Sequence, residues 1–262
     1  MRTPLIAGNW KMHKTLPDAR ELVQGIREGV EDHTAGDGAA GVDVLICPPV
    51  QLLFPMAKAV AGSPVMLGAQ NVHEEPQGAF TGEVSVPMLR ETGCTHVIVG
   101  HSERRHIFGE GGQRLARKVR AVVGGGLTAI YCVGETLAER EAGQTRLVVE
   151  RQMNEVINRD VVADRLVIAY EPVWAIGTGK TATPDEAQEV HALIRNLLGE
   201  TYDASVADST RILYGGSVKP ANAAGLLAQR DIDGALVGGA CLVAGDFLAI
   251  IAAASCGSPA SC

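Results

Sequence analysis

The sequence predicts an α/β fold: a single-domain (β/α)8 barrel with a closed eight-stranded parallel sheet. Eight short apolar runs recur along the chain, and each ends in a cluster of glycine or polar residues. The runs are continuously apolar rather than alternating, as in strands that are buried on both faces. Helix-like segments separate them, and eight such units fill about 250 residues. An open, doubly wound sheet is the alternative arrangement of the same elements.

The eight strand candidates are spread evenly from the N-terminus to residue 240. They are LIAGNWK from Leu5, VDVLICPP from Val42, VMLGAQN from Val65, THVIVGHSE from Thr95, LTAIYCVGE from Leu127, LVIAYEP from Leu166, RILYGGS from Arg211 and GALVGGA from Gly234. We expect all eight to be buried strands.

Helices are expected over residues 16–30, over the charged stretch 139–158, and from Thr183 onward. The last of these carries a capping box, because Thr183 can cap the helix and Glu186 follows three residues later, with Pro184 at the first helical position. The segment SERR after His101 is also expected to start a helix.

Composition indicates one globular domain over residues 1–262, with 46% hydrophobic and 20% charged residues and a mean hydropathy of +0.11. The glycine-rich segment Gly36–Gly41 and a loose C-terminal tail, about residues 254–262, are expected to be surface excursions without an assigned role. The net charge of -7 provides no basic surface for nucleic acid or anionic membranes. An anionic ligand therefore needs a local positive pocket.

Six cysteines are scattered through the chain without a CxxC pair or a histidine at metal-ligand spacing. We therefore expect no metal site and no disulfide framework, which fits a reducing compartment. The segment MRTPLIAGNWK lacks the pattern of a signal peptide, and no uncharged apolar stretch of about 18 residues occurs. These features predict a cytoplasmic protein that does not enter a membrane.

The chemistry of a barrel of this kind lies where its strands end. Polar groups follow the earlier strands, and glycines with one serine follow the last two, as a phosphate cradle of backbone amides requires. The strand-end residues are Asn9, Lys11, His101, Glu103, Cys132, Glu135, Glu171, Gly215, Gly216, Ser217, Gly238 and Gly239.

Five of these strand-end segments, GNWKM, VIVGHSERR, AYEPVWAIGTGKTATP, YGGSV and LVGGA, occur in an order that resembles the triosephosphate isomerase family. The resemblance covers some 230 residues, and the five motifs together are specific although each alone is weak. It implies a TIM barrel that interconverts dihydroxyacetone phosphate and D-glyceraldehyde 3-phosphate, with no cofactor and no metal.

The resemblance also implies catalytic roles. Glu171 would be the general base, His101 the electrophile and proton shuttle, Lys11 the stabiliser of negative charge, and Asn9 a residue that positions Lys11 and the substrate. In this family the helix after the histidine is known to keep the imidazole neutral, a property taken over with the resemblance. Without the resemblance, each side chain has a simpler structural interpretation. Glu171 would be a solvated carboxylate, His101 a core histidine, Lys11 a surface lysine, and Asn9 a turn residue.

The substrate phosphate would bind backbone amides, and a mobile lid would cover the site. The implied phosphate-binding residues are Gly177, Ser217, Gly238 and Gly239. Residues 172–180 would form the lid, which shields the intermediate from water. Glu103 would support Lys11, and Cys132 is expected to pack rather than to act as a nucleophile, because no base accompanies it.

The segment NVHEEPQGAFTGEVSVPML from Asn71 resembles the loop through which family members form homodimers. Thr81 would then reach the partner's site, and Glu83 with Arg104 would form a cross-subunit pair. A long polar loop that is merely exposed is the alternative.

Two residues depart from the pattern that is familiar in the family. His13 stands where asparagine is common, and Cys241 stands where serine or alanine is common. Because Cys241 follows the phosphate glycines, its oxidation is a hypothetical route to disturbing that loop.

Two other functions remain open at this point. A phosphate-binding lyase or Schiff-base aldolase on the same barrel would be favoured by a lysine at the end of the sixth strand, where Glu171 stands. A catalytically silent barrel that serves as a binding or scaffold protein would be expected to lack at least one of the catalytic residues.

Overall fold

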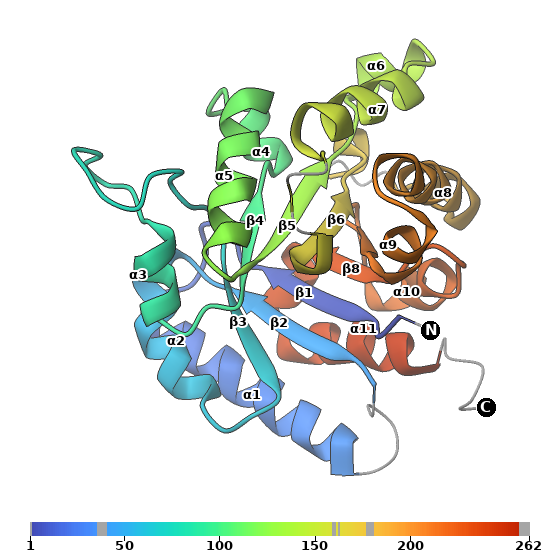
Figure 1. Ribbon diagram of the computed structural model, residues 1–262. Helices are drawn as coiled ribbons and strands as arrows, with labels where there is room; N and C mark the ends of the chain where they lie inside the picture. Colours follow the sequence, from blue (N-terminus) through green and yellow to red (C-terminus); the bar gives the residue numbers. More distant parts are fainter. Residues whose placement is uncertain (1, 36–40, 159–160, 162, 177–180, 257–262) are drawn as a thin grey trace.

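The computed structural model describes residues 2–35, 41–158, 161, 163–176 and 181–256, and all eight predicted strands are present (Figure 1). They pair in chain order as a closed parallel barrel, which confirms the predicted fold class and excludes the open sheet. The strands are β1 (Leu5–Asn9), β2 (Asp43–Cys47), β3 (Val65–Ala69), β4 (His96–Val99), β5 (Thr128–Val133), β6 (Leu166–Tyr170), β7 (Arg211–Tyr214) and β8 (Gly234–Val237).

Closure depends on the pairing of the first strand with the last, in which Leu5 lies opposite Gly234. A Cβ atom on Gly234 would lie 2.0 Å from the carbonyl oxygen of Leu5, and its φ is +138°. Only glycine therefore fits at this seam.

Alternation along the strands divides the core into an inner and an outer cluster. Leu5 and Ala7 of β1 belong to the small cluster that fills the barrel, whereas Ile6 joins the larger cluster that contacts the helices. Both faces of each strand are apolar for this reason, which is the continuous pattern seen in the sequence.

Helices surround the strands, and the last helix lies beside the first and completes the outer ring (Figure 1). They are α1 (Leu16–Ala35), α2 (Leu53–Val60), α3 (Val86–Glu91), α4 (Ser102–His106), α5 (Gly112–Gly124), α6 (Leu137–Glu141), α7 (Thr145–Val156), α8 (Pro184–Thr201), α9 (Ala204–Ser209), α10 (Pro220–Leu227) and α11 (Ala244–Cys256). Four 3₁₀ turns are also present in the described ranges: η1 (Val50–Leu52), η2 (Ala163–Arg165), η3 (Val173–Ala175) and η4 (Gly239–Leu242).

The helix predictions are confirmed with one difference. Thr183 caps α8, and both hydrogen bonds of the capping box with Glu186 form. SERR begins α4, with His101 as its N-cap. The stretch 139–158, however, is divided between α6 and α7, because Gly143 adopts a φ of +69° that ends the first helix.

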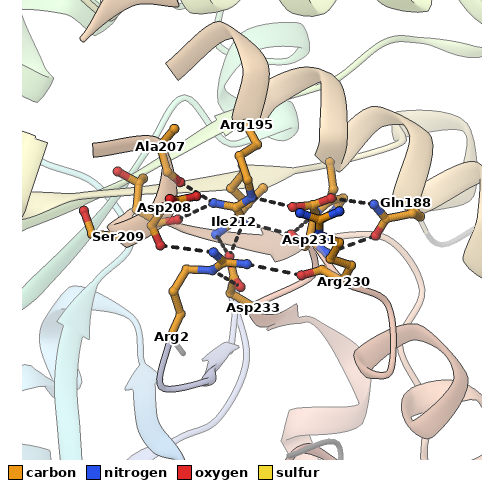
Figure 2. A network of polar contacts seen from close by, with 12 residues as sticks. Arg2, Gln188, Arg195, Ala207, Asp208, Ser209, Ile212, Arg230, Asp231 and Asp233 are labelled. Atoms are coloured by element: carbon orange, nitrogen blue, oxygen red, sulfur yellow. Dashed lines mark hydrogen bonds and ion pairs between the residues drawn. The ribbon is translucent and has the colours of Figure 1, made fainter. Parts of the chain in front are cut away.

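A network of charged side chains joins the first residues of the chain to its last strands at the amino end of the barrel (Figure 2). Arg195 of α8 contacts Asp231 and Asp233 at 2.6 Å each. Arg2 pairs with the same Asp233, whose carboxylate also accepts from the backbone N–H of Ile212 at 2.8 Å. The network therefore links β1, β7, β8 and α8.

Two predicted surface segments fall largely outside the described residues. For the segment Gly36–Gly41 only Gly41 is described, and of the tail only residues 254–256 are described, where they form the end of α11. Within the described ranges, every helix is too short or too polar to span a bilayer.

Candidate active site

A cavity of about 530 Å³ opens at the carboxyl ends of the strands. It brings together side chains and glycines that are far apart in the sequence. The predicted site residues that line it are Asn9, Lys11, His101, Glu171, Ser217, Gly238 and Gly239. Gly177 and the rest of the predicted lid after Ile176, residues 178–180, lie outside the described residues.

Glu171 directly follows β6 and is only 2% exposed. One carboxylate oxygen lies 3.1 Å from Nε2 of His101, and the other accepts a hydrogen bond of 2.8 Å from the backbone N–H of Ser102. Two glycines make room for it: a Cβ on Gly134 would lie 1.8 Å from the Glu171 carbonyl oxygen, and one on Gly215 would lie 2.8 Å from its Cγ. A buried carboxylate and an imidazole therefore face each other in the cavity.

The start of α4 fixes the tautomer of His101. As the N-cap, its Nδ1 accepts a hydrogen bond of 3.2 Å from the backbone N–H of Glu103. An accepting Nδ1 carries no proton, which places a ring proton on Nε2, the nitrogen that faces Glu171.

Lys11 is held in an unusual backbone conformation, with a φ of +50°. Its N–H donates to the side-chain oxygen of Asn9 at 3.0 Å, and its carbonyl accepts from Gln70 at 2.8 Å. Nζ lies 2.8 Å from a carboxylate oxygen of Glu103. Asn9, Gln70 and Glu103 together direct the ammonium into the cavity, since a left-handed conformation persists only where its surroundings enforce it.

The part of the cavity predicted to bind phosphate is lined by residues that follow β7 and β8. Gly238 lies beside Lys11, because a Cβ on Gly238 would sit 3.6 Å from Lys11 Cε. The loop of Ser217 is pinned by Asn222, whose amide accepts from Lys219 N at 2.7 Å and donates to Ser217 O at 3.0 Å. The sequence analysis does not identify Asn222. Its position three residues after Lys219, the N-cap of α10, is the pattern that could have predicted this contact.

A second group of residues anchors the segment that follows Glu171. Trp174 donates from its indole N–H to Glu135 at 2.9 Å, and Tyr170 donates to the same carboxylate at 3.1 Å. The guanidinium of Arg140 lies 4.6 Å from the centroid of the Trp174 ring and 2.7 Å from Glu186. The sequence identifies Glu135 as an acid at a strand end but assigns it no role. It does not predict that Tyr170 contacts Glu135 or that Arg140 contacts Trp174.

The two cysteines near the site are buried. Burial and the neighbouring carboxylate of Glu171 raise the pKa of Cys132 well above its usual value. Burial raises the pKa of the Cys241 thiol to about 12. Both thiols are therefore protonated at neutral pH, which is expected of cysteines that pack rather than react.

A neighbouring cavity of about 540 Å³ also reaches Asn9, Lys11 and His101. Glu83, Arg104 and Phe108 line it. The segment between β3 and α3, which contains Thr81, projects away from the barrel (Figure 1). Within the chain, Arg104 pairs with Glu110 at 2.7 Å.

Comparison with known proteins agrees with this architecture. The family model described as "Triosephosphate isomerase" matches residues 4–254. A triosephosphate isomerase of Roseiflexus sp. (strain RS-1) is 55% identical, with 96% of this chain and 97% of the relative covered. Those of Moorella thermoacetica and Pelobacter propionicus are 54% and 53% identical, each with 96% of this chain and 98% of the relative covered. The chain therefore belongs to the triosephosphate isomerase family.

Proposed function

We propose that the protein interconverts dihydroxyacetone phosphate and D-glyceraldehyde 3-phosphate through an enediol(ate), with Glu171 as general base. The 3.1 Å approach of the buried Glu171 carboxylate to Nε2 of His101 is the observation that carries the proposal. The two triose phosphates differ by one proton moved between adjacent carbons and one moved between oxygens, so one base and one oxygen-directed donor suffice.

The reaction moves one proton between carbons and one between oxygens, each in two transfers. Glu171 releases Ser102 and His101 when substrate enters, takes a proton from the carbon beside the carbonyl, and later returns it to the neighbouring carbon. His101 donates its Nε2 proton to the developing oxyanion and recovers one from the other oxygen. The ammonium of Lys11, already turned into the cavity, offsets the negative charge of the enediolate.

Binding of the phosphate group is assigned to backbone amides of Ser217, Gly238 and Gly239, with Gly177 contributing from the lid. Residues 172–180 are proposed to close over the intermediate. The anchoring of Trp174 on Glu135 supports this role, since it gives the beginning of that segment a defined attachment beside the cavity.

A cytoplasmic homodimer is proposed, and residues 1–262 are proposed to form one domain. Large apolar side chains exposed near the second cavity support the dimer: Met12 is 93% exposed and Phe108 66%. Thr81 would enter the partner's cavity, with Glu83 and Arg104 paired between subunits. The buried free cysteines among the described residues support a reducing location.

The decisive experiment measures isomerisation of D-glyceraldehyde 3-phosphate by coupling the product to a reporting enzyme. Glu171→Asp retracts the carboxylate by one methylene, so we expect turnover to fall about 100-fold or more with an unchanged circular dichroism spectrum. Glu28→Asp, an exposed position on α1, serves as the matched control and should keep full activity. Wild-type turnover in Glu171→Asp would contradict the assignment of the base.

The same assay separates the other functions. A silent scaffold would show no turnover in the wild-type protein. A Schiff-base aldolase would be inactivated by borohydride in the presence of substrate, with a covalent adduct detectable by mass spectrometry.

A further inference from the structure

We propose that Lys219 is a specificity-determining cation of the site, which attracts and holds the phosphate dianion of the substrate without taking part in proton transfer. The inference rests on the proposed function. Lys219 lines the cavity together with Ser217 and the two glycines after β8.

Without Lys219, the side chains around the cavity supply too little positive charge to balance a bound phosphate dianion. Lys11 is paired with Glu103 at 2.8 Å, so only part of its charge is available to the substrate, and it is assigned to the enediolate. Glu171 and Asp246 line the cavity as acids, and the chain carries a net charge of -7. A phosphate monoester brings a charge of about -1.5 to -2 at neutral pH and would meet net repulsion.

Lys219 is free to meet this charge. Among the ion pairs of the described residues it takes part in none, and its side chain is exposed. His13, another ionisable residue that lines the cavity, is also exposed. Lys219 is thus an exposed ammonium among the residues that line the cavity, and it is available to an incoming phosphate.

The backbone of Lys219 is fixed even though its side chain is exposed. Asn222 accepts its N–H at 2.7 Å and holds Ser217 O at 3.0 Å, and Pro220 follows as the first residue of α10. The ammonium is therefore tethered two residues from the proposed phosphate amide of Ser217. Proton transfer is assigned to Glu171 and His101, which lie 3.1 Å apart, so Lys219 is assigned to binding alone.

A cation that acts only on the phosphate stabilises bound substrate and transition state equally. Its removal should raise KM and leave kcat within about twofold. Because the side chain is exposed, the effect is modest and depends on ionic strength: we expect KM to rise about threefold to tenfold at low salt and less than about twofold in 0.5 M salt.

The test compares Lys219→Met with Lys219→Arg and with Lys58→Met. Lys58 is an exposed lysine in a groove between α1 and α2, away from the cavity, so Lys58→Met changes the net charge equally. Lys219→Met should raise KM in a salt-dependent manner, Lys219→Arg should restore it, and Lys58→Met should match the wild type. Equal KM values for the two methionine variants would overturn the inference.

Equilibrium binding of glycerol 3-phosphate, which has no carbonyl and does not react, gives a readout that is independent of turnover. Its dissociation constant should rise about threefold to tenfold in Lys219→Met at low salt and stay unchanged in Lys58→Met. Absence of turnover in the wild type would defeat the proposed function, whereas the binding comparison would still decide the role of Lys219. Unchanged binding, or no binding to the wild type, would overturn that role.

Discussion

Single side chains in this protein owe their chemistry to burial more than to their type. Cys241 follows Gly238 and Gly239, to which phosphate binding is assigned. The sequence therefore suggests the hypothesis that oxidation of Cys241 disturbs this loop. Its thiol is fully buried, and its pKa is raised to about 12, so the reactive thiolate is scarce. The structure thus removes the support for an oxidation switch at this position.

Peroxide titration should therefore inactivate the wild-type protein and Cys241→Ser at the same rate. The expected result follows from the absence of both exposure and thiolate at Cys241. Residual activity after graded peroxide treatment is the measurement, and selective protection of the serine variant would restore the oxidation hypothesis.

His191 makes stability depend on pH. It is fully buried beside Tyr170 and Tyr214, and burial lowers its pKa from 6.5 to about 4. Between these values the unfolded chain binds the proton and the folded chain does not, so stability is lost as the pH falls from about 6.5 to about 4. At about 1.4 kcal/mol per pKa unit, this one group accounts for up to about 3 kcal/mol.

Urea unfolding at pH 7, 5.5 and 4.5 measures this dependence. His191→Gln should flatten the decline in the unfolding free energy, while His106→Gln at an exposed position should keep the wild-type slope. Equal slopes in all three proteins would contradict the assignment to His191. His96, whose pKa is also lowered to about 4 by burial, should account for part of the slope that remains.

At the level of elements, the signals that sequence analysis read correctly are local. The capping box of α8 lies within four residues, and the polar strand ends of a barrel converge by geometry. The contacts of Gln152 are an example that the sequence does not predict. Its side-chain amide accepts from Gly134 N at 2.8 Å and donates to Gly134 O at 3.0 Å, although the two residues are 18 positions apart. Partners of this kind depend on how α7 packs against the strand end, which no local pattern encodes.

The cap of α8 gives a test at this scale. Thr183→Ala removes the side-chain acceptor of the Glu186 N–H, and we expect a loss of about 1 kcal/mol, or a fall in Tm of about 2–4 °C. Thr183→Ser keeps the acceptor and should remain close to the wild type. Thermal unfolding followed by circular dichroism measures the difference; equal losses in both variants would show that the methyl group, not the cap, matters.

Over the whole molecule, the two ends of the barrel have separate tasks. The cavity lies at the carboxyl ends of the strands, and the charged network of Arg2, Arg195, Asp231 and Asp233 lies at the amino ends (Figure 2). In such barrels the first end serves chemistry and the second serves stability.

Arg195→Met should therefore destabilise the protein without impairing the site. It removes the guanidinium shared by two carboxylates that are at most 10% exposed. Asp233 keeps Arg2 and Asp231 keeps Gln188, so we expect a cost below the roughly 3–5 kcal/mol of a fully unpaired buried charge, about 2–3 kcal/mol. Arg2→Met, at a more exposed position, should cost about 1 kcal/mol. Urea unfolding gives both values, and kcat measured well below Tm should stay at the wild-type level; a loss of kcat in the folded Arg195→Met protein would contradict the separation.

The seam between β1 and β8 has a consequence for synthesis in the cell. Asp233 is synthesised 231 residues after its partner Arg2, roughly 10 to 50 s later at ordinary translation rates. Throughout that interval β1 has an open edge capable of pairing with a neighbouring nascent chain. We therefore expect the nascent chain to need protection of this edge until β8 has been synthesised.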